Sequence, residues 1–344
     1  MKRLILHAGM HKTGTTAIQS IAAKNRDDLF KKGVYYPRSW EFFGNPSHLP
    51  SANAHFSLFN ALAGLRPRDK KNLQRFRTHL LEEIPDDFTI LLSAESLNRH
   101  VVPQAASFAE GHRAYIARVA EYFAGFHTEA VVYFRQPSDF AESMYAENAV
   151  SYPVIEGFKK AQKSFVKRFQ YRELREGYAV HFPISCRSFE AEKDRLPGSF
   201  WRDSGLPAPS DILERTRRPS IPKAAVRWIY RAKRHRGAPM ERPERLRRWL
   251  FAYQDENAQL FRSSVASSFW DGLSDSAAFH DQMLDGFGDI AFARPASVPP
   301  RCAWSAQDHA QAEARFAAWQ TERADWLRER AERGVPPFID PEAP

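Results

Sequence analysis

The sequence predicts an α/β fold in which helices cover both faces of a parallel sheet. Through the first half of the 344-residue chain, short apolar runs alternate with longer segments whose apolar residues recur every three or four positions. This alternation is typical of parallel sheets, because two parallel strands need a long crossover connection, usually a helix. In such sheets ligands bind at the carboxyl ends of the strands.

Four segments are short and apolar, and we predict that they are strands: 2–8, 88–93, 129–134 and 178–184. Six longer segments have helical periodicity and are predicted helices: 15–25, 57–63, 70–83, 113–126, 137–150 and 158–175. Functional residues are therefore expected in the segments that follow the strands: 9–16, 94–96, 135–138 and 185–187.

The second half of the chain is predicted to be helical and to add no strand. Helical periodicity broken by prolines marks 222–236 and 243–262, and a long final helix is expected at 305–333. We expect one continuous domain, in which an α/β core at 1–206 carries a helical C-terminal extension at 207–344 packed on it.

The excess positive charge is confined to one segment. The chain has 50 Lys and Arg against 41 Asp and Glu, a formal net charge of +9. Residues 214–248 hold 13 of the basic and 3 of the acidic residues, a local net charge of +10. The remainder is nearly neutral, which excludes a uniformly basic nucleic-acid coat. A hydrophobic fraction of 43% also excludes a disordered chain.

Neither export nor membrane insertion is expected. The apolar run near the N-terminus covers only residues 4–6, which is too short for a signal peptide. No window approaches the roughly 18 apolar residues that a membrane-spanning helix needs. The two cysteines, Cys186 and Cys302, match no metal or redox spacing and are expected to be reduced thiols. We expect a cytoplasmic protein.

The first candidate motif is GMHKTGTT at 9–16, after the first predicted strand and at the start of a helix. Its glycines permit a sharp turn, and the amides from Gly14 to Thr16 can bind a phosphate. In nucleoside-triphosphate loops Lys follows the second glycine, and the next Ser or Thr holds magnesium. Here Thr15 takes the position of that Lys, and Lys12 precedes Gly14 by two residues. We therefore expect phosphate binding without an obligatory metal; a plain glycine turn is the alternative.

The second candidate motif lies in VVYFRQPSDFAESMYAE at 131–147. A strand is predicted to end at Arg135, Pro137 suits the first turn of a helix, and Ser143 follows about two turns later. A guanidinium and a hydroxyl can bind the same phosphate. For this motif taken alone, the simpler interpretation is that Arg135 forms a surface salt bridge and that Ser143 is a neutral helix residue.

Together the two motifs resemble those of the family of sulfotransferases that use PAPS, 3′-phosphoadenosine 5′-phosphosulfate, as donor. The family's 5′-phosphosulfate loop reads roughly Pro-Lys-Ser/Thr-Gly-Thr-Thr, and the matching residues here are His11, Lys12, Thr13, Gly14, Thr15 and Thr16. Its 3′-phosphate motif is a strand-terminal Arg followed eight residues later by Ser, which is the spacing of Arg135 and Ser143. The resemblance reaches to about Leu206 and looks closest to the bacterial branch related to carbohydrate sulfotransferases.

The resemblance implies a sulfotransferase fold of the P-loop NTPase type and transfer of a sulfuryl group from PAPS to a hydroxyl or amine, without a metal. A carbohydrate is the expected acceptor. Two departures from the family stand out: His11 replaces the usual Pro, and the late glycine-rich loop that closes over the 3′-phosphate in many relatives has no counterpart that we can place. The alternatives are a P-loop kinase-like ATP-binding enzyme and a non-catalytic polyanion-binding module.

Catalysis by such an enzyme needs a cation and a base. Lys12 is the candidate cation, between the leaving phosphate oxygen and the sulfuryl group. Glu95 is the candidate base because it follows the predicted strand 88–93; its alternative role is an exposed carboxylate at a helix start. His55 is the rival base, or else a packing residue. His7 and His11 flank the loop and are weaker candidates.

The basic segment 214–248 is the candidate acceptor surface. Lys223, Arg227, Arg231 and Arg234 recur at helical spacing and would lie on one helix face. In the functional interpretation this face binds an acidic acceptor, such as a uronic-acid or sulfated glycan. A solvated helix face explains the pattern equally well, and we expect no nucleic-acid partner.

Overall fold

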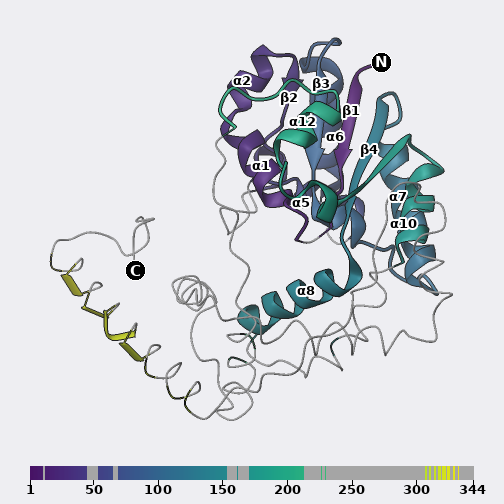
Figure 1. Cartoon of the computed structure of the whole chain (residues 1–344). Coiled ribbons are helices and arrows are strands. Elements are labelled where there is room, and N and C mark those ends of the chain that lie inside the picture. Colours follow the sequence, from purple (N-terminus) through teal and green to yellow (C-terminus); the bar gives the residue numbers. More distant parts are fainter. Residues whose placement is uncertain are drawn as a thin grey trace. The chain divides into compact units, whose positions relative to one another are not determined.

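A computed structural model describes residues 1–10, 12–44, 53–64, 69–152 and 170–212, together with 161, 226, 229 and scattered positions between 307 and 332. The chain divides into two compact units. The first comprises 1–140, 165–217 and 274–294, and contains the sheet and its helices. The second comprises 141–164, 218–273 and 295–344. Figure 1 shows the course of the chain.

The first unit is built on a parallel sheet of five strands in the order β2-β3-β1-β4-β5. Its strands are β1 (Arg3–His7), β2 (Val34–Tyr35), β3 (Thr89–Ser93), β4 (His127–Phe134) and β5 (Ile184–Ser188). In the register, Ile5 of β1 lies opposite Leu91 of β3 and Glu129 of β4. The predicted parallel α/β architecture is therefore confirmed.

Helices connect the strands (Figure 1). Those near the N-terminal strands are α1 (Thr15–Lys24), α2 (Arg26–Lys31), α3 (Trp40–Phe43), α5 (Phe56–Leu62) and α6 (Lys70–Thr78), which continues as the π-helix η2 (His79–Glu83). The 3-10 helix η3 (Glu95–Asn98) follows β3. The later helices are α7 (Phe108–Tyr122), α8 (Pro137–Ser151), α10 (Tyr171–Ala179), α11 (Phe189–Glu192) and α12 (Gly198–Asp203). α8 begins in the first unit and continues into the second.

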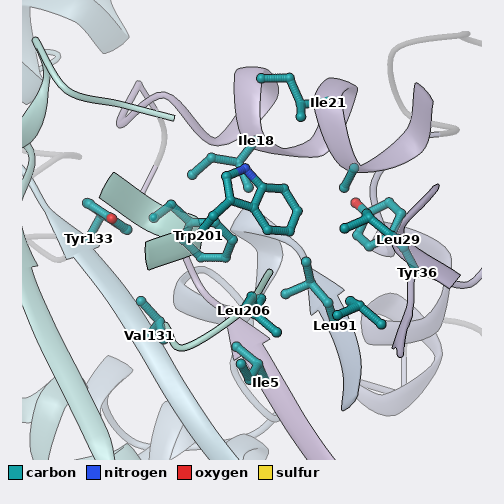
Figure 2. Packing of buried hydrophobic residues seen from close by; sticks show 13 residues of the cluster. Ile5, Ile18, Ile21, Leu29, Tyr36, Leu91, Val131, Tyr133, Trp201 and Leu206 are labelled. Atoms are coloured by element: carbon teal, nitrogen blue, oxygen red, sulfur yellow. The ribbon is translucent and has the colours of Figure 1, made fainter. Parts of the chain in front are cut away.

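One face of the sheet packs against α1, α2 and α12. Ile5, Leu91 and Val131 from the three central strands share a buried cluster with Ile18 of α1 and Trp201 of α12. Figure 2 shows the Trp201 indole between Ile18 on one side and Ile5 on the other. The segment after β5 therefore returns across the sheet and completes the core beside the first helix.

The opposite face packs against α10 and its neighbours. Side chains alternate along a strand, so Leu6, Leu92 and Phe134 point away from the Trp201 cluster, and all three are fully buried. The ring of Phe134 lies 4.8 Å from that of Tyr171 in α10. Because both faces are covered, the three central strands are apolar on both sides, as is typical of parallel sheets.

The last predicted strand was placed wrongly. The predicted strand is 178–184, but Tyr171–Ala179 is the helix α10, and the strand β5 comes later, at Ile184–Ser188. Tyr178 is fully buried with Leu174 because it continues the helical spacing of α10 rather than a strand. Among the strands of the described residues, β5 pairs with β4 alone, and it is mostly polar, as an edge strand can be. A run of apolar residues, the pattern from which the strands are predicted, is therefore absent from β5.

Shorter elements were also missing from the prediction: β2, α2, α3, α11 and α12. The predicted helices 222–236 and 243–262 fall outside the described residues, apart from the helical, buried Val226 and Ile229. The described positions between 307 and 332 are helical, in agreement with the final predicted helix. Among the described helices, none combines the length and hydrophobicity that a membrane span requires.

The strand order places a topological switch point between the carboxyl ends of β1 and β4. From β1 the chain runs toward β2 and β3, whereas from β4 it runs the other way, to β5. Neighbouring strands whose connections leave in opposite directions open a crevice at their carboxyl ends, which is where open α/β sheets bind ligands. The motif at 9–16 follows β1 and Arg135 follows β4, so the fold brings this loop and Arg135 to the same place.

Candidate functional site

The loop after β1 follows the neighbouring strand before it turns into α1. The amides of Ala8 and Met10 donate to the carbonyls of Val131 and Tyr133 on β4, at 2.9 and 3.2 Å. Lys12 (φ 67°) and Gly14 (φ 74°) then adopt left-handed backbone conformations on either side of Thr13. Alternating backbone of this kind turns successive amides to one side, which makes a concave site for an anion.

The hydroxyls of Thr13 and Thr15 point into the loop itself. Thr13 Oγ1 donates to the Met10 carbonyl at 2.6 Å and lies 3.2 Å from Thr15 Oγ1. Both threonines are buried, whereas Thr16 is exposed. Within the predicted donor-binding set, Thr13 and Thr15 therefore shape the loop by their side chains and would bind an anion through their amides, while Thr16 also presents a hydroxyl.

Gly9 is required by the close approach of these side chains. A Cβ atom at Gly9 would overlap Thr15 Oγ1, and it would lie 3.0 Å from Thr13 Oγ1 and 3.3 Å from His7 Nε2. No larger residue fits at Gly9 unless the loop shifts. The geometry of the turn thus depends on Gly9 for space, and on Gly14 for its positive φ.

The start of α1 favours a bound anion. Gly14 precedes the helix and has no side chain that could cap the amides of the first turn. The first turn also carries no acidic residue. Because the helix dipole is positive at this end and the first amides have no partner within the helix, an anion here would be stabilised.

Arg135 joins the two predicted motifs directly. It stands at the end of β4, and its Nη1 donates to the Lys12 carbonyl at 3.0 Å. The side chain is 17% exposed. A guanidinium and the Lys12 residue therefore lie at one edge of the loop, which gives the site two basic residues.

Three further contacts surround Arg135. The Tyr171 hydroxyl donates to its carbonyl at 2.6 Å. Its guanidinium lies 5.2 Å from the centre of the Phe189 ring, and its Nε is 3.6 Å from Glu190 Oε1. Phe189 and Glu190 belong to α11, directly after β5. The sequence did not indicate these two residues because the predicted strand ends four residues before β5 does. Ser188, whose side chain accepts from the Ala191 amide, is the helix-start signal that marks them.

The 3-10 helix η3 supports the beginning of the loop. Asn98 Nδ2 donates to the Ala8 carbonyl at 2.5 Å, and the Tyr178 hydroxyl donates to Asn98 Oδ1 at 2.9 Å. Glu95 opens the same helix, next to Ala94, whose amide donates to the His7 carbonyl. Glu95 is half-buried and lies at the predicted edge of the sheet. Its role as a base stays a prediction.

His55 is a structural residue in this arrangement. The Ser93 amide donates to Nδ1 at 2.9 Å, so the ring proton is on Nε2, which donates to the Pro37 carbonyl at 3.0 Å. The ring is 1% exposed, and burial lowers its pKa to about 4. With both nitrogens engaged, His55 fits the packing alternative and has no nitrogen available for an acceptor proton.

His7 is fully buried beneath the loop. Its Nδ1 lies 2.9 Å from Ser93 Oγ, which also accepts from Gln19 Nε2. Burial, with a further contribution from Arg187, lowers its pKa to about 3. A neutral ring without exposure cannot reach a substrate, so His7 supports the loop and is not a base.

The donor-binding roles of the predicted residues, His11 and Ser143 among them, stay predictions. His11 lies outside the described residues. Ser143 is half-buried within α8 and belongs to the second unit. Of the basic segment 214–248, only Val226 and Ile229 are described, so its predicted cationic face stays a prediction. Over the described part of the chain, no group of three or more His, Cys, Asp and Glu side chains is arranged to hold a metal.

The chain is distantly similar to a solved structure of a known enzyme. No family model and no curated protein matches the chain. Among solved structures, a sulfotransferase from Alicyclobacillus acidocaldarius is similar over 69% of this chain and 94% of that chain, with 13% identity and a TM-score of 0.39. A likeness at this level shows neither the family nor the site, so the function is inferred from the residues.

Replacing Gly9 by Ala should distort the loop and lower stability by about 1–3 kcal/mol, the usual cost of overpacking. The added Cβ would overlap Thr15 Oγ1. Urea unfolding monitored by circular dichroism measures the loss, and Gly9→Ala combined with Thr15→Ala should recover part of it. Gly198→Ala is the matched control, because its Cβ meets nothing within 4 Å. Equal stability of Gly9→Ala and Gly198→Ala would contradict the geometry.

Stability should also fall as the pH is lowered from 7 to 5. Burial holds the pKa of His112 at about 4, against 6.5 for an ordinary histidine, and His7 and His55 are lowered similarly. Below pH 6.5 the unfolded chain binds protons that the folded chain does not, so each such histidine removes up to about 1.4 kcal/mol per pH unit. Urea unfolding at pH 7, 6 and 5 measures this slope.

The variant His112→Gln isolates one of these groups. Its amide can replace the donor of the 3.1 Å contact from His112 Nε2 to the Leu97 carbonyl, but it does not titrate. The variant should therefore show a shallower dependence of stability on pH than the wild type. An identical slope, or a wild type whose stability rises on acidification, would refute the assignment.

Proposed function

We propose that this protein is a sulfotransferase that transfers a sulfuryl group from PAPS to a hydroxyl or amine acceptor, with a carbohydrate as the expected substrate class. The observation that supports this most strongly is the hydrogen bond from Arg135 Nη1 to the Lys12 carbonyl. Two motifs more than a hundred residues apart in the sequence were each assigned to one end of the same donor. Their direct contact at the carboxyl edge of the sheet is what a shared ligand requires.

The loop residues suit the anionic groups of the donor. The amides at the start of α1 and the cationic Lys12 would bind the 5′-phosphosulfate, and Gly9 leaves the space for a tight turn. The Arg135 guanidinium would bind the 3′-phosphate. Ser143 is the proposed further contact to that phosphate, on the family resemblance alone.

The side-chain directions favour sulfuryl transfer over a kinase reaction. In nucleoside-triphosphate loops a Lys follows the second glycine, and the next hydroxyl holds magnesium. Here Thr15 follows Gly14, and its hydroxyl lies beside Thr13 Oγ1 inside the loop. The Lys stands earlier, at position 12. This arrangement supports binding of a phosphate by amides and a lysine rather than binding of a magnesium nucleotide.

The donor would supply an activated sulfuryl group, and the chain would bind it, orient it and manage the proton. Glu95 would take the proton of the acceptor hydroxyl as the new oxygen–sulfur bond forms. Lys12 would offset the charge on the phosphate oxygen as its bond to sulfur breaks. Positioning and electrostatics would supply most of the rate enhancement, by analogy with phosphoryl transfer.

Binding of 3′-phosphoadenosine 5′-phosphate, measured by isothermal titration calorimetry, tests the donor site. Lys12→Ala and Arg135→Ala should each weaken binding at least tenfold, because charge-assisted hydrogen bonds contribute about 1.5–3 kcal/mol. Lys31→Ala is the control, because Lys31 is an exposed lysine on α2, and this variant should bind as the wild type does.

A wild type that does not bind this nucleotide refutes the proposal. Magnesium-dependent binding of ATP instead would support the kinase, and strongly salt-dependent polyanion binding that survives Lys12→Ala would support the binding module.

Glu95→Gln tests the base. Loss of the carboxylate should reduce turnover by about a hundredfold or more, the usual range for general-base catalysis, with nucleotide affinity unchanged. Turnover is measured as release of 3′-phosphoadenosine 5′-phosphate from PAPS in the presence of candidate glycan acceptors. Glu82→Gln, at an exposed position of η2, is the control. Full activity of Glu95→Gln would exclude this residue as the base.

A further inference from the structure

We propose that Glu190 limits the affinity of Arg135 for the 3′-phosphate and thereby sets how readily the nucleotide product is released. The inference rests on the proposed function, in which Arg135 binds that phosphate. Glu190 has no counterpart among the residues that the sequence motifs identify. It enters the site through α11, the helix that follows the edge strand β5.

The carboxylate of Glu190 is held beside the guanidinium. The Gln136 amide donates to Glu190 Oε2 at 3.0 Å, and Glu190 Oε1 lies 3.6 Å from Arg135 Nε. The Glu190 side chain is 24% exposed and the Arg135 side chain 17%. Because the carboxylate is anchored to the backbone next to Arg135, a ligand anion that approaches Arg135 meets a fixed negative charge.

Arg135 is oriented without the help of Glu190. Its Nη1 donates to the Lys12 carbonyl, and its guanidinium lies over the Phe189 ring. These two contacts hold the guanidinium at the edge of the loop, and neither involves Glu190. The contribution of Glu190 is therefore mainly its charge, which lowers the positive potential that Arg135 presents.

Such a charge affects a dianionic ligand most. A 3′-phosphate bound to Arg135 would stand close to Glu190, and repulsion in a partly buried site is screened less than at an exposed one. The interaction weakens binding of the donor and of the nucleotide product alike. An enzyme of this kind gains from it, since release of a tightly bound product is a common limit on turnover.

The variant Glu190→Gln tests the inference, because the Gln carbonyl oxygen can still accept from the Gln136 amide while the charge is removed. The Kd of 3′-phosphoadenosine 5′-phosphate should fall roughly 3- to 30-fold, as expected for one unit charge at a partly buried site. The Kd of adenosine 5′-phosphate, which lacks the 3′-phosphate, should change less than about twofold on the same grounds. Both are measured by isothermal titration calorimetry.

Two controls separate a specific effect from a general one. Asp194→Asn removes one negative charge from an exposed position just beyond α11, and it should leave both affinities unchanged. In an Arg135→Ala background, Glu190→Gln should no longer increase the affinity for 3′-phosphoadenosine 5′-phosphate. Thermal unfolding of each variant confirms that it is folded.

The outcomes distinguish this inference from the proposed function. If the wild type binds 3′-phosphoadenosine 5′-phosphate but Glu190→Gln binds it equally or more weakly, Glu190 positions Arg135 and the inference is overturned. An equal increase in the affinity of Glu190→Gln for both nucleotides overturns the inference too, because the charge of Glu190 would then not act on the 3′-phosphate. A wild type that binds neither nucleotide overturns the proposed function itself.

Discussion

The hydrogen bond between the Arg135 guanidinium and the Lys12 carbonyl is the contact on which the candidate site depends. It links the ends of β1 and β4, the two central strands whose connections leave in opposite directions. Lys12 makes its carbonyl available there while in a left-handed backbone conformation. The contact thus fixes the loop against the neighbouring strand and places two basic residues at one edge of the sheet.

Elements from both faces of the sheet stabilise this contact. From one face, α10 supplies the Tyr171 hydroxyl to the Arg135 carbonyl, and through Tyr178 and Asn98 it supports the start of the loop. From the other, α11 brings Phe189 and Glu190 to the guanidinium. The same surroundings that hold the arginine therefore also place a negative charge beside it.

Sequence reasoning succeeded where periodicity or a glycine motif determines the local structure. The central strands, the loop at 9–16 and the place of Arg135 follow from apolar runs and turn residues. It failed for β5, because an edge strand with one neighbour has little need of apolar residues. It also left the role of His55 open, since only the Ser93 amide and the Pro37 carbonyl show that both ring nitrogens are engaged.

The parallel α/β architecture and the motif residues near its carboxyl edge follow from the amino-acid sequence alone, because strand length, helical period and glycine position are local properties. Which of these groups point into the loop or away from it follows only from packing. The tertiary structure turned the hydroxyls of Thr13 and Thr15 inward, buried His7 beneath the loop and set Glu190 beside Arg135. Those outcomes depend on neighbours that are distant along the chain, and therefore on the packing of α10, α11 and η3 around the sheet.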